Sequence, residues 1–253
     1  MRFIDLSATI ENSPPEAPPY NRTEIVYYDH KAGAAQIEKL FGVPPELLRN
    51  GEGWAIEEFR QLGTHNTTHV DAPWHYNSVI QGKRAATIDE LPLEWFFNDG
   101  VVLSMLHKAD GDAVTVADIK NELKRIGYTL KPLDIVLVHT GRDRFYGDPN
   151  YVFMGPGVSA EATRWLYEQG IRVMGIDAWG WDAPLNLQAK KALAERRPGI
   201  FWAAHQVDLP YAQIERLVNL HRLPSFGFKV ACFPLKVKGG SAGPARVVAI
   251  LDE

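Results

Sequence analysis

Two short, continuous apolar runs mark the middle of the chain. One extends from Gly100 to Leu106 and the other from Asp134 to Thr140. Runs of this length without polar alternation are typical of strands buried on both faces. Between them, apolar residues at helical spacing follow Thr115, which begins a capping-box-like sequence, and Gly127 stands where a helix C-cap is expected. The order strand, helix, strand predicts a crossover unit of a parallel sheet.

The same order repeats later in the chain. Ser159 can cap a helix that continues through Gln169, and a further apolar run from Val173 to Ile176 follows it. Additional strands are expected within residues 3–10, 24–28, 56–62, 226–233 and 246–251. We therefore predict an α/β fold in which residues 1–253 form a single domain with a mixed sheet.

Prolines are concentrated in one early segment, residues 13–19. Such a sequence predicts an extended, polyproline-like arm. The arm is either a plain surface connection or a segment that wraps a partner subunit or borders a pocket, and the sequence leaves both interpretations open.

Composition narrows the class of protein. The formal net charge is -4, which argues against a nucleic-acid partner because such proteins need a basic face. No apolar run approaches the roughly 20 residues that span a bilayer, and the first ten residues alternate like a strand rather than a signal peptide. Cys232 is the single cysteine, so no internal disulfide can form. These features predict a cytoplasmic protein that binds neither nucleic acid nor a membrane.

Metal-binding side chains are concentrated in one segment that contains His65, His69, Asp71 and His75. Imidazoles and carboxylates bind divalent Zn, Mn or Fe. The β-branched neighbours and a following proline oppose a helix, so we expect a strand from His69 onward, in which His69 and Asp71 face the same side. His65 then approaches from the preceding turn, and His75 returns after a bend. A single histidine more often caps a turn or packs, but four such residues so close together favour a site.

The four residues of this segment can have two different chemical roles, metal binding and proton transfer. Two imidazoles and a carboxylate form an open metal site that keeps positions for water and substrate. The metal lowers the pKa of water and polarises a carbonyl. A nearby unligated histidine, His75, suits proton transfer near neutral pH.

The segment resembles the motif of the cyclase family of metal-dependent hydrolases, which includes bacterial kynurenine formamidases and isatin hydrolases. The usual form is His-x-Gly-Thr-His-x-Asp-x-Pro-x-His. This chain reads His-Asn-Thr-Thr-His-Val-Asp-Ala-Pro-Trp-His from His65 to His75. It departs from the motif at Thr67, which stands where the family has Gly and whose Cβ can tighten the turn.

Later segments extend the resemblance over almost the whole chain. Residues 175–177, with Asp182 downstream, are similar to the family's Gly-x-Asp segment. His205 and Glu215 are similar to its late His and Glu, while Arg216 stands where the family usually has Asn.

The resemblance implies roles for these residues. The implied metal ligands are His65, His69, Asp71, His205 and Glu215. His75 is the implied acid/base, and His205 and Glu215 either complete a second metal position or move protons and orient water. The family further implies a fold of the swivelling β/β/α type, one or two Zn²⁺ or Mn²⁺ ions per subunit, and a homodimer or homotetramer.

We therefore expect a metal-dependent amidohydrolase that opens a C–N bond in a formamide, cyclic imide or lactam-like small molecule by a metal-activated water. Trp74 and Trp181 are expected to line an aromatic-tolerant pocket, and Trp54 and Trp202 are further candidates. Two alternatives stay open. One is metal-dependent dehydration, cyclisation or isomerisation of a hydroxy- or keto-acid, and the other is a non-catalytic metal-binding protein.

Overall fold

The computed structural model describes residues 1–15, 17 and 22–252. The chain divides into two compact units, one made of Met1–Ala8 and Thr67–Glu253, the other of Thr9–Asn66. Of the proline-rich segment 13–19, residues 16, 18 and 19 lie outside the described residues.

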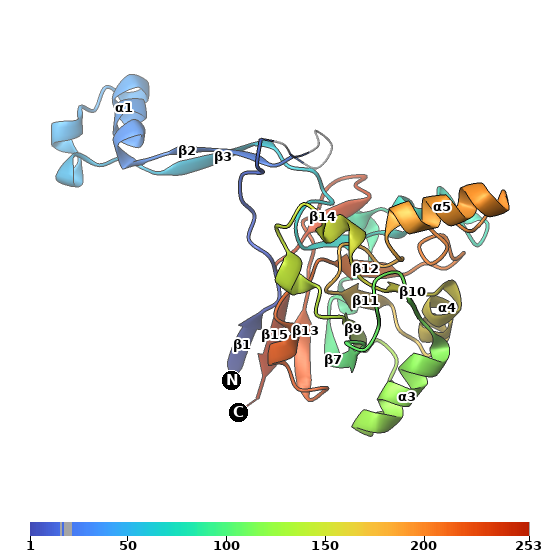
Figure 1. Cartoon of the computed structure of the whole chain (residues 1–253). Coiled ribbons are helices and arrows are strands. Elements are labelled where there is room, and N and C mark those ends of the chain that lie inside the picture. The colour runs from blue at the N-terminus through green and yellow to red at the C-terminus, as the bar shows by residue number, and fades with distance from the viewer. Residues whose placement is uncertain (16, 18–21, 253) are drawn as a thin grey trace. The chain divides into compact units, whose positions relative to one another are not determined.

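A mixed nine-stranded sheet forms the centre of the first unit (Figure 1). In spatial order its strands are β1 (Arg2–Asp5), β15 (Val248–Leu251), β13 (Phe228–Ala231), β7 (Phe97–Ser104), β9 (Ile135–His139), β11 (Val173–Ile176), β12 (Ala212–Glu215), β4 (His69–Asp71) and β14 (Ala242–Pro244). The four strands β7, β9, β11 and β12 run parallel, and the strands on either side of them pair antiparallel. The predicted α/β fold with a mixed sheet is confirmed.

Helices α3 (Val116–Ile126) and α4 (Ala160–Glu168) pack against one face of this sheet (Figure 1). Thr115 caps α3 through a capping box, and Gly127 ends the helix in the left-handed conformation, as predicted. The side chain of Ser159 caps the start of α4, as the sequence predicted.

Alternating side chains of the central strands fill a hydrophobic core on each face of the sheet. In β7, Val101 and Leu103 lie in the core beneath α3 and α4, whereas Val102 lies in the opposite core. Dense packing on both faces holds the strand ends in fixed positions. Side chains at those ends are therefore well suited to form a rigid site.

Shorter elements complete the first unit. They are α2 (Pro73–Tyr76), α5 (Leu185–Glu195), the antiparallel pair β5 (Val79–Ile80) and β6 (Lys83–Arg84), the parallel pair β8 (Ala113–Val114) and β10 (Gly157–Val158), and 3-10 turns at 88–90, 93–95, 143–145, 151–153 and 220–222.

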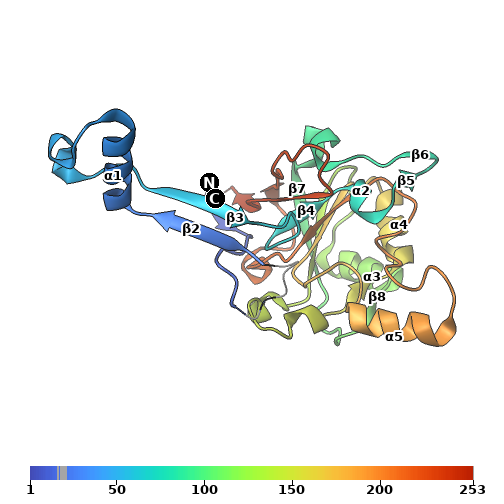
Figure 2. The same ribbon diagram turned by 90° about the horizontal axis from the view of Figure 1, so that it is seen from above.

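The second unit is built on an antiparallel pair, β2 (Glu24–Tyr28) and β3 (Ile56–Gln61) (Figure 2). The sequence predicted the two strands but not their pairing. Helix α1 (His30–Phe41) and 3-10 turns at 45–47 and 49–51 connect the two strands. Every residue of β3 is exposed. Among the described residues of both units, no helix is long and apolar enough to cross a membrane.

Candidate metal centre

Three buried donor side chains meet where β4 lies beside β12. The strand register pairs His69 with Glu215, and Asp71 lies two residues farther along β4. Residues two apart on a strand face the same side, as the sequence predicted for His69 and Asp71. The Nε2 atom of His69 lies 3.2 Å from Asp71 Oδ1 and 3.7 Å from Glu215 Oε2. None of the three residues is more than 5% exposed, so their charges interact with little screening by water.

A backbone carbonyl fixes the orientation of the His69 ring. Its Nδ1 lies 2.9 Å from the carbonyl oxygen of Thr67. A carbonyl can only accept, so Nδ1 carries a proton and Nε2 is the ring nitrogen that faces the carboxylates. Proteins orient metal-binding histidines by this kind of outer hydrogen bond.

Thr67 holds that carbonyl in place through an unusual backbone conformation. Its φ is 55°, in the left-handed region that β-branched residues rarely adopt. Its Oγ1 donates to the carbonyl oxygen of Ala8 at 3.1 Å. Thr67 thus occupies a left-handed turn, a conformation that a residue without Cβ adopts at lower cost.

His205 reaches the cluster from the loop between α5 and β12. Asp182 accepts three hydrogen bonds there, from the backbone N–H of Ala204 (3.0 Å) and from the backbone N–H and Nδ1–H of His205 (2.9 and 2.6 Å). The opposite ring atom, Nε2, lies 3.4 Å from Glu215 Oε1. Burial lowers the pKa of His205, but its hydrogen bonds to Asp182 and Glu215 outweigh that effect and raise the pKa to about 10.

Glu215 lies between the two histidines and is held by the backbone of a neighbouring loop. The N–H of Trp181 donates to Glu215 Oε1 at 2.9 Å. Burial disfavours the carboxylate form, yet the hydrogen bond from His205 keeps the pKa of Glu215 below its usual value. Glu215 is therefore an anion at neutral pH despite its burial.

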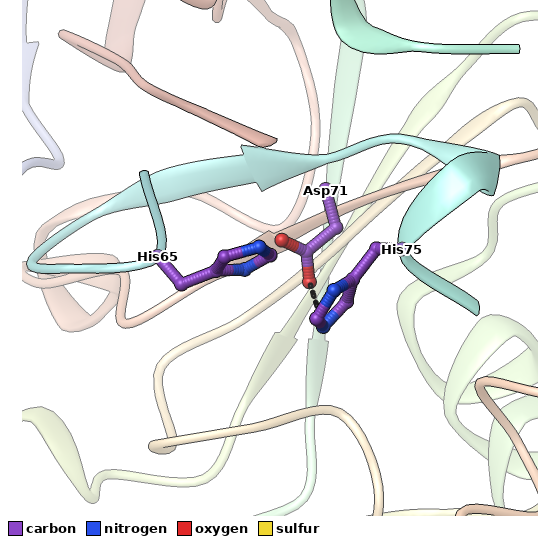
Figure 3. Close-up of side chains that lie close together, drawn as sticks. All are labelled: His65, Asp71 and His75. Carbon is purple, nitrogen blue, oxygen red and sulfur yellow. Dashed lines mark ion pairs between the residues drawn. The ribbon is translucent and has the colours of Figure 1, made fainter. Parts of the chain in front are cut away.

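His65 and His75 flank Asp71 within the same short segment (Figure 3). The three residues can each offer a ligand atom within 4.8 Å of the other two. His75 Nε2 lies 4.0 Å from Asp71 Oδ2, and the side chain of His75 is 23% exposed. His75 therefore contacts both a buried carboxylate and solvent, which suits proton transfer.

Trp202 connects two of the site histidines. Its ring stacks on His205 at a centroid distance of 4.5 Å and meets His75 edge-on at 4.9 Å. Its backbone is left-handed, with φ of 64°, and its N–H donates to the Gln188 side chain at 2.5 Å. The sequence marked Trp202 only as one tryptophan among several, because no local pattern indicates this stack.

The two tryptophans predicted to contact substrate differ in exposure. Trp74, next to His75 in α2, is 39% exposed and can contact a bound molecule. Trp181 is fully buried, and its Nε1 donates to Thr163 Oγ1 at 2.9 Å. The structure corrects the expectation for the Trp181 ring, which lies in the core, while the backbone N–H of this residue serves the site through Glu215.

Asp177, which the sequence also marked, lies outside the cluster. Its carboxylate accepts hydrogen bonds from the N–H and Oγ1 of Thr140 and from the N–H of Gly141, at 2.6 to 2.8 Å. Burial raises the pKa of Asp177 to about 6, although these hydrogen bonds oppose the rise. Its role in the fold is to join the ends of β9 and β11.

The donor set fits a divalent cation. Two groups of ligand atoms, each within 4.8 Å, are formed by His65, Asp71 and His75 and by His69, Asp71 and Glu215. Asp71 belongs to both groups, and its charge raises the pKa of Glu215, so a cation between the two carboxylates would relieve their repulsion. Imidazole nitrogens and carboxylate oxygens are ligands suited to Zn²⁺ and Mn²⁺.

A comparison with known families gives the class of this protein. The family model described as "Putative cyclase" matches residues 4–183. The chain therefore belongs to the cyclase family, as its motifs predicted.

Individual relatives agree with this assignment. The kynurenine formamidase of Erythrobacter litoralis is 27% identical over 203 residues, which cover 79% of this chain and 80% of the relative. Isatin hydrolase A from Labrenzia aggregata, solved with benzyl benzoate, has a TM-score of 0.73 and 24% identity, covering 100% of this chain and 94% of that one. Isatin hydrolase A from Ralstonia solanacearum has a TM-score of 0.77 and 22% identity, covering 99% and 92%. The two solved structures share the fold of this chain.

Proposed function

We propose that this protein is a metal-dependent hydrolase that cleaves a C–N bond in a formamide, cyclic imide or lactam-like small molecule. The observation that carries the proposal is the buried cluster of His69, Asp71 and Glu215, in which Thr67 orients one imidazole from behind. His205, oriented by Asp182, adds a second imidazole. Buried donors arranged in this way are typical of a metal site rather than of a hydrophobic core.

The names of the relatives support the choice of reaction. A kynurenine formamidase and two isatin hydrolases act, by name, on a formamide and on a cyclic amide. We propose the same kind of reaction for this chain. We also propose that its fold is of the swivelling β/β/α type.

The proposed ligands of one or two Zn²⁺ or Mn²⁺ ions are His65, His69, Asp71, His205 and Glu215. When bound, such a cation polarises the scissile carbonyl and lowers the pKa of water. His75 moves a proton from water to the leaving nitrogen, since it is partly exposed and lies beside Asp71. Trp74 provides an apolar surface for the substrate. If Glu215 does not bind a metal ion, its carboxylate orients the attacking water.

Activity assays test this proposal directly. Purified protein loaded with Zn²⁺ or Mn²⁺ is incubated with N-formylkynurenine, isatin and simple imides, and the products are identified by mass spectrometry. We expect a product whose mass has increased by one water. If the metal-loaded protein cleaves no amide, imide or ester, the hydrolase proposal is refuted.

A second reaction is favoured by the family description "Putative cyclase". The same site could promote dehydration, cyclisation or isomerisation of a hydroxy- or keto-acid. The mass of the product separates the reactions, because isomerisation leaves it unchanged, loss of water lowers it and hydrolysis raises it.

We further propose that the protein forms a homodimer or homotetramer. The second unit exposes large apolar side chains at Tyr27, Phe41, Leu47 and Phe59, which are 54–73% exposed. Apolar side chains gathered on one small unit are typical of an association surface. Sedimentation equilibrium should show an oligomer for the natural chain and a smaller species for the double substitution Phe41→Glu and Phe59→Glu.

A further inference from the structure

Arg216 is a buried cation next to the proposed metal ligand Glu215. Only 6% of its surface is exposed. Arginine does not lose its proton inside proteins, so it cannot escape the cost of burial by becoming neutral. A buried charge is tolerated when an opposite charge accompanies it. We therefore expect Arg216 to have a binding partner of opposite charge.

The guanidinium of Arg216 is held from one side and free on the other. Its Nε donates to the carbonyl oxygen of Trp179 at 3.3 Å, and its Cζ lies 4.7 Å from the centre of the Trp179 ring. Within the described part of the chain, Nη1 and Nη2 donate to no acceptor and form no ion pair. Four N–H groups of a fixed, planar cation are thus available to a ligand.

Two carboxylates in adjacent segments, those of Glu215 and Asp177, are engaged with other groups. Glu215 Oε1 accepts from the N–H of Trp181 and lies 3.4 Å from His205 Nε2. Both oxygens of Asp177 accept hydrogen bonds from the turn after β9. Neither residue forms an ion pair with Arg216 among the described residues, so the two Nη groups remain open to an anion from outside the described chain.

One short loop places Arg216 close to the metal cluster. The carbonyl of Trp179 accepts from Arg216, and the N–H of Trp181 donates to Glu215. Two residues span at most about 7 Å, so these two anchor points are neighbours. The backbone of Arg216 is fixed as well, because its carbonyl accepts from Thr68 Oγ1 at 2.6 Å.

We propose that Arg216 binds a carboxylate of the substrate. A guanidinium can donate two parallel hydrogen bonds to the two oxygens of a carboxylate, and the Trp179 ring behind it holds its plane. The inference rests on the proposed function and adds to it: the amide substrate carries a carboxylate a few bonds from the scissile C–N bond.

A binding experiment tests the subsite without relying on activity. Chelator-treated protein is titrated calorimetrically with benzoate and with benzamide, so that the carboxylate cannot bind a metal ion. We expect benzoate to bind about 10- to 100-fold more tightly than benzamide, as charge-assisted hydrogen bonds predict. Arg216→Gln should abolish this preference, Arg216→Lys should retain part of it, and the exposed control Arg222→Gln should leave it unchanged.

Steady-state kinetics provide a second test of the Arg216 subsite. With a formanilide and its ring-carboxylated analogue as substrates, Arg216→Gln should raise KM for the carboxylated compound about 10- to 100-fold and leave the neutral compound within twofold. If the natural protein cleaves neither compound, the proposed function fails while the benzoate titration still decides the subsite. Equal binding of benzoate and benzamide by the natural protein overturns the subsite even if Arg216→Gln does not fold. Unchanged benzoate affinity in a folded Arg216→Gln protein overturns it as well.

Discussion

Asp177 should make the stability of this protein fall as the pH rises through the weakly acidic range. Burial raises the pKa of its carboxyl from the ordinary 3.8 to about 6 in the folded state. Between these two values the folded protein holds a proton that the unfolded chain has released, so the free energy of unfolding decreases with increasing pH. The contribution is fully present below pH 3.8 and is lost above about pH 6.

The magnitude follows from the two pKa values. The difference between 3.8 and about 6 corresponds to about 3 kcal/mol at 25 °C. Substitution of Asp177 by Asn removes the titration but also a hydrogen bond. An Asn oxygen can still accept from Thr140, whereas its NH2 group would face the N–H of Gly141. That mismatch costs about 1–3 kcal/mol at every pH.

The two effects predict a change in the order of stability. At pH 4 the Asp177→Asn protein should be less stable than the natural protein by most of that cost. At pH 7 it should be equally stable or more stable by up to about 2 kcal/mol. Urea denaturation of both proteins at pH 4, 5, 6 and 7 measures this, since the difference between them cancels the titration of all other groups. A difference that stays constant, or that grows against Asn with rising pH, would refute the reasoning.

Four further predictions concern the site and one helix. His75→Gln should lower kcat about 10²- to 10⁴-fold while elemental analysis finds the metal content unchanged, and the exposed control His107→Gln should do neither. Asp182→Ala, which deprives three N–H groups of their acceptor, should lower the free energy of unfolding in urea by about 2–4 kcal/mol. Removal of the metal by a chelator should lower the Tm of the natural protein, because a ligand of the folded state stabilises it, but not the Tm of His69→Ala. Thr115→Ala should cost about 1 kcal/mol in urea denaturation through loss of the α3 cap, and an unchanged midpoint would contradict that account.

Features encoded by neighbouring residues could be predicted from the sequence. The cap at Thr115, the stop at Gly127 and the strand that carries His69 and Asp71 all lie where expected. These features depend on backbone hydrogen bonds and side-chain alternation within a few residues. The boundaries of buried strands were less accurate: β7 begins at Phe97, because exposed and polar residues at its start hide the pattern.

Features that depend on distant residues could not be predicted in the same way. The family motif pointed to His205 and Glu215, but only the strand register shows that Glu215 lies opposite His69. Asp182 orients His205 through a hydrogen bond between residues 23 positions apart, for which a sequence has no periodic signal. Helices α1 and α5 also went unpredicted.

The position of β4 between β12 and β14 determines when the site can form during synthesis. Neither hydrogen-bonding edge of β4 is satisfied until strands far along the chain have been made, and the bond from Thr68 to Arg216 closes a separation of 148 residues. Contacts of such long range form late in folding because chain closure costs entropy. His69 and Asp71 are therefore expected to reach their final positions late in folding, after the strands that pair with β4 have joined it.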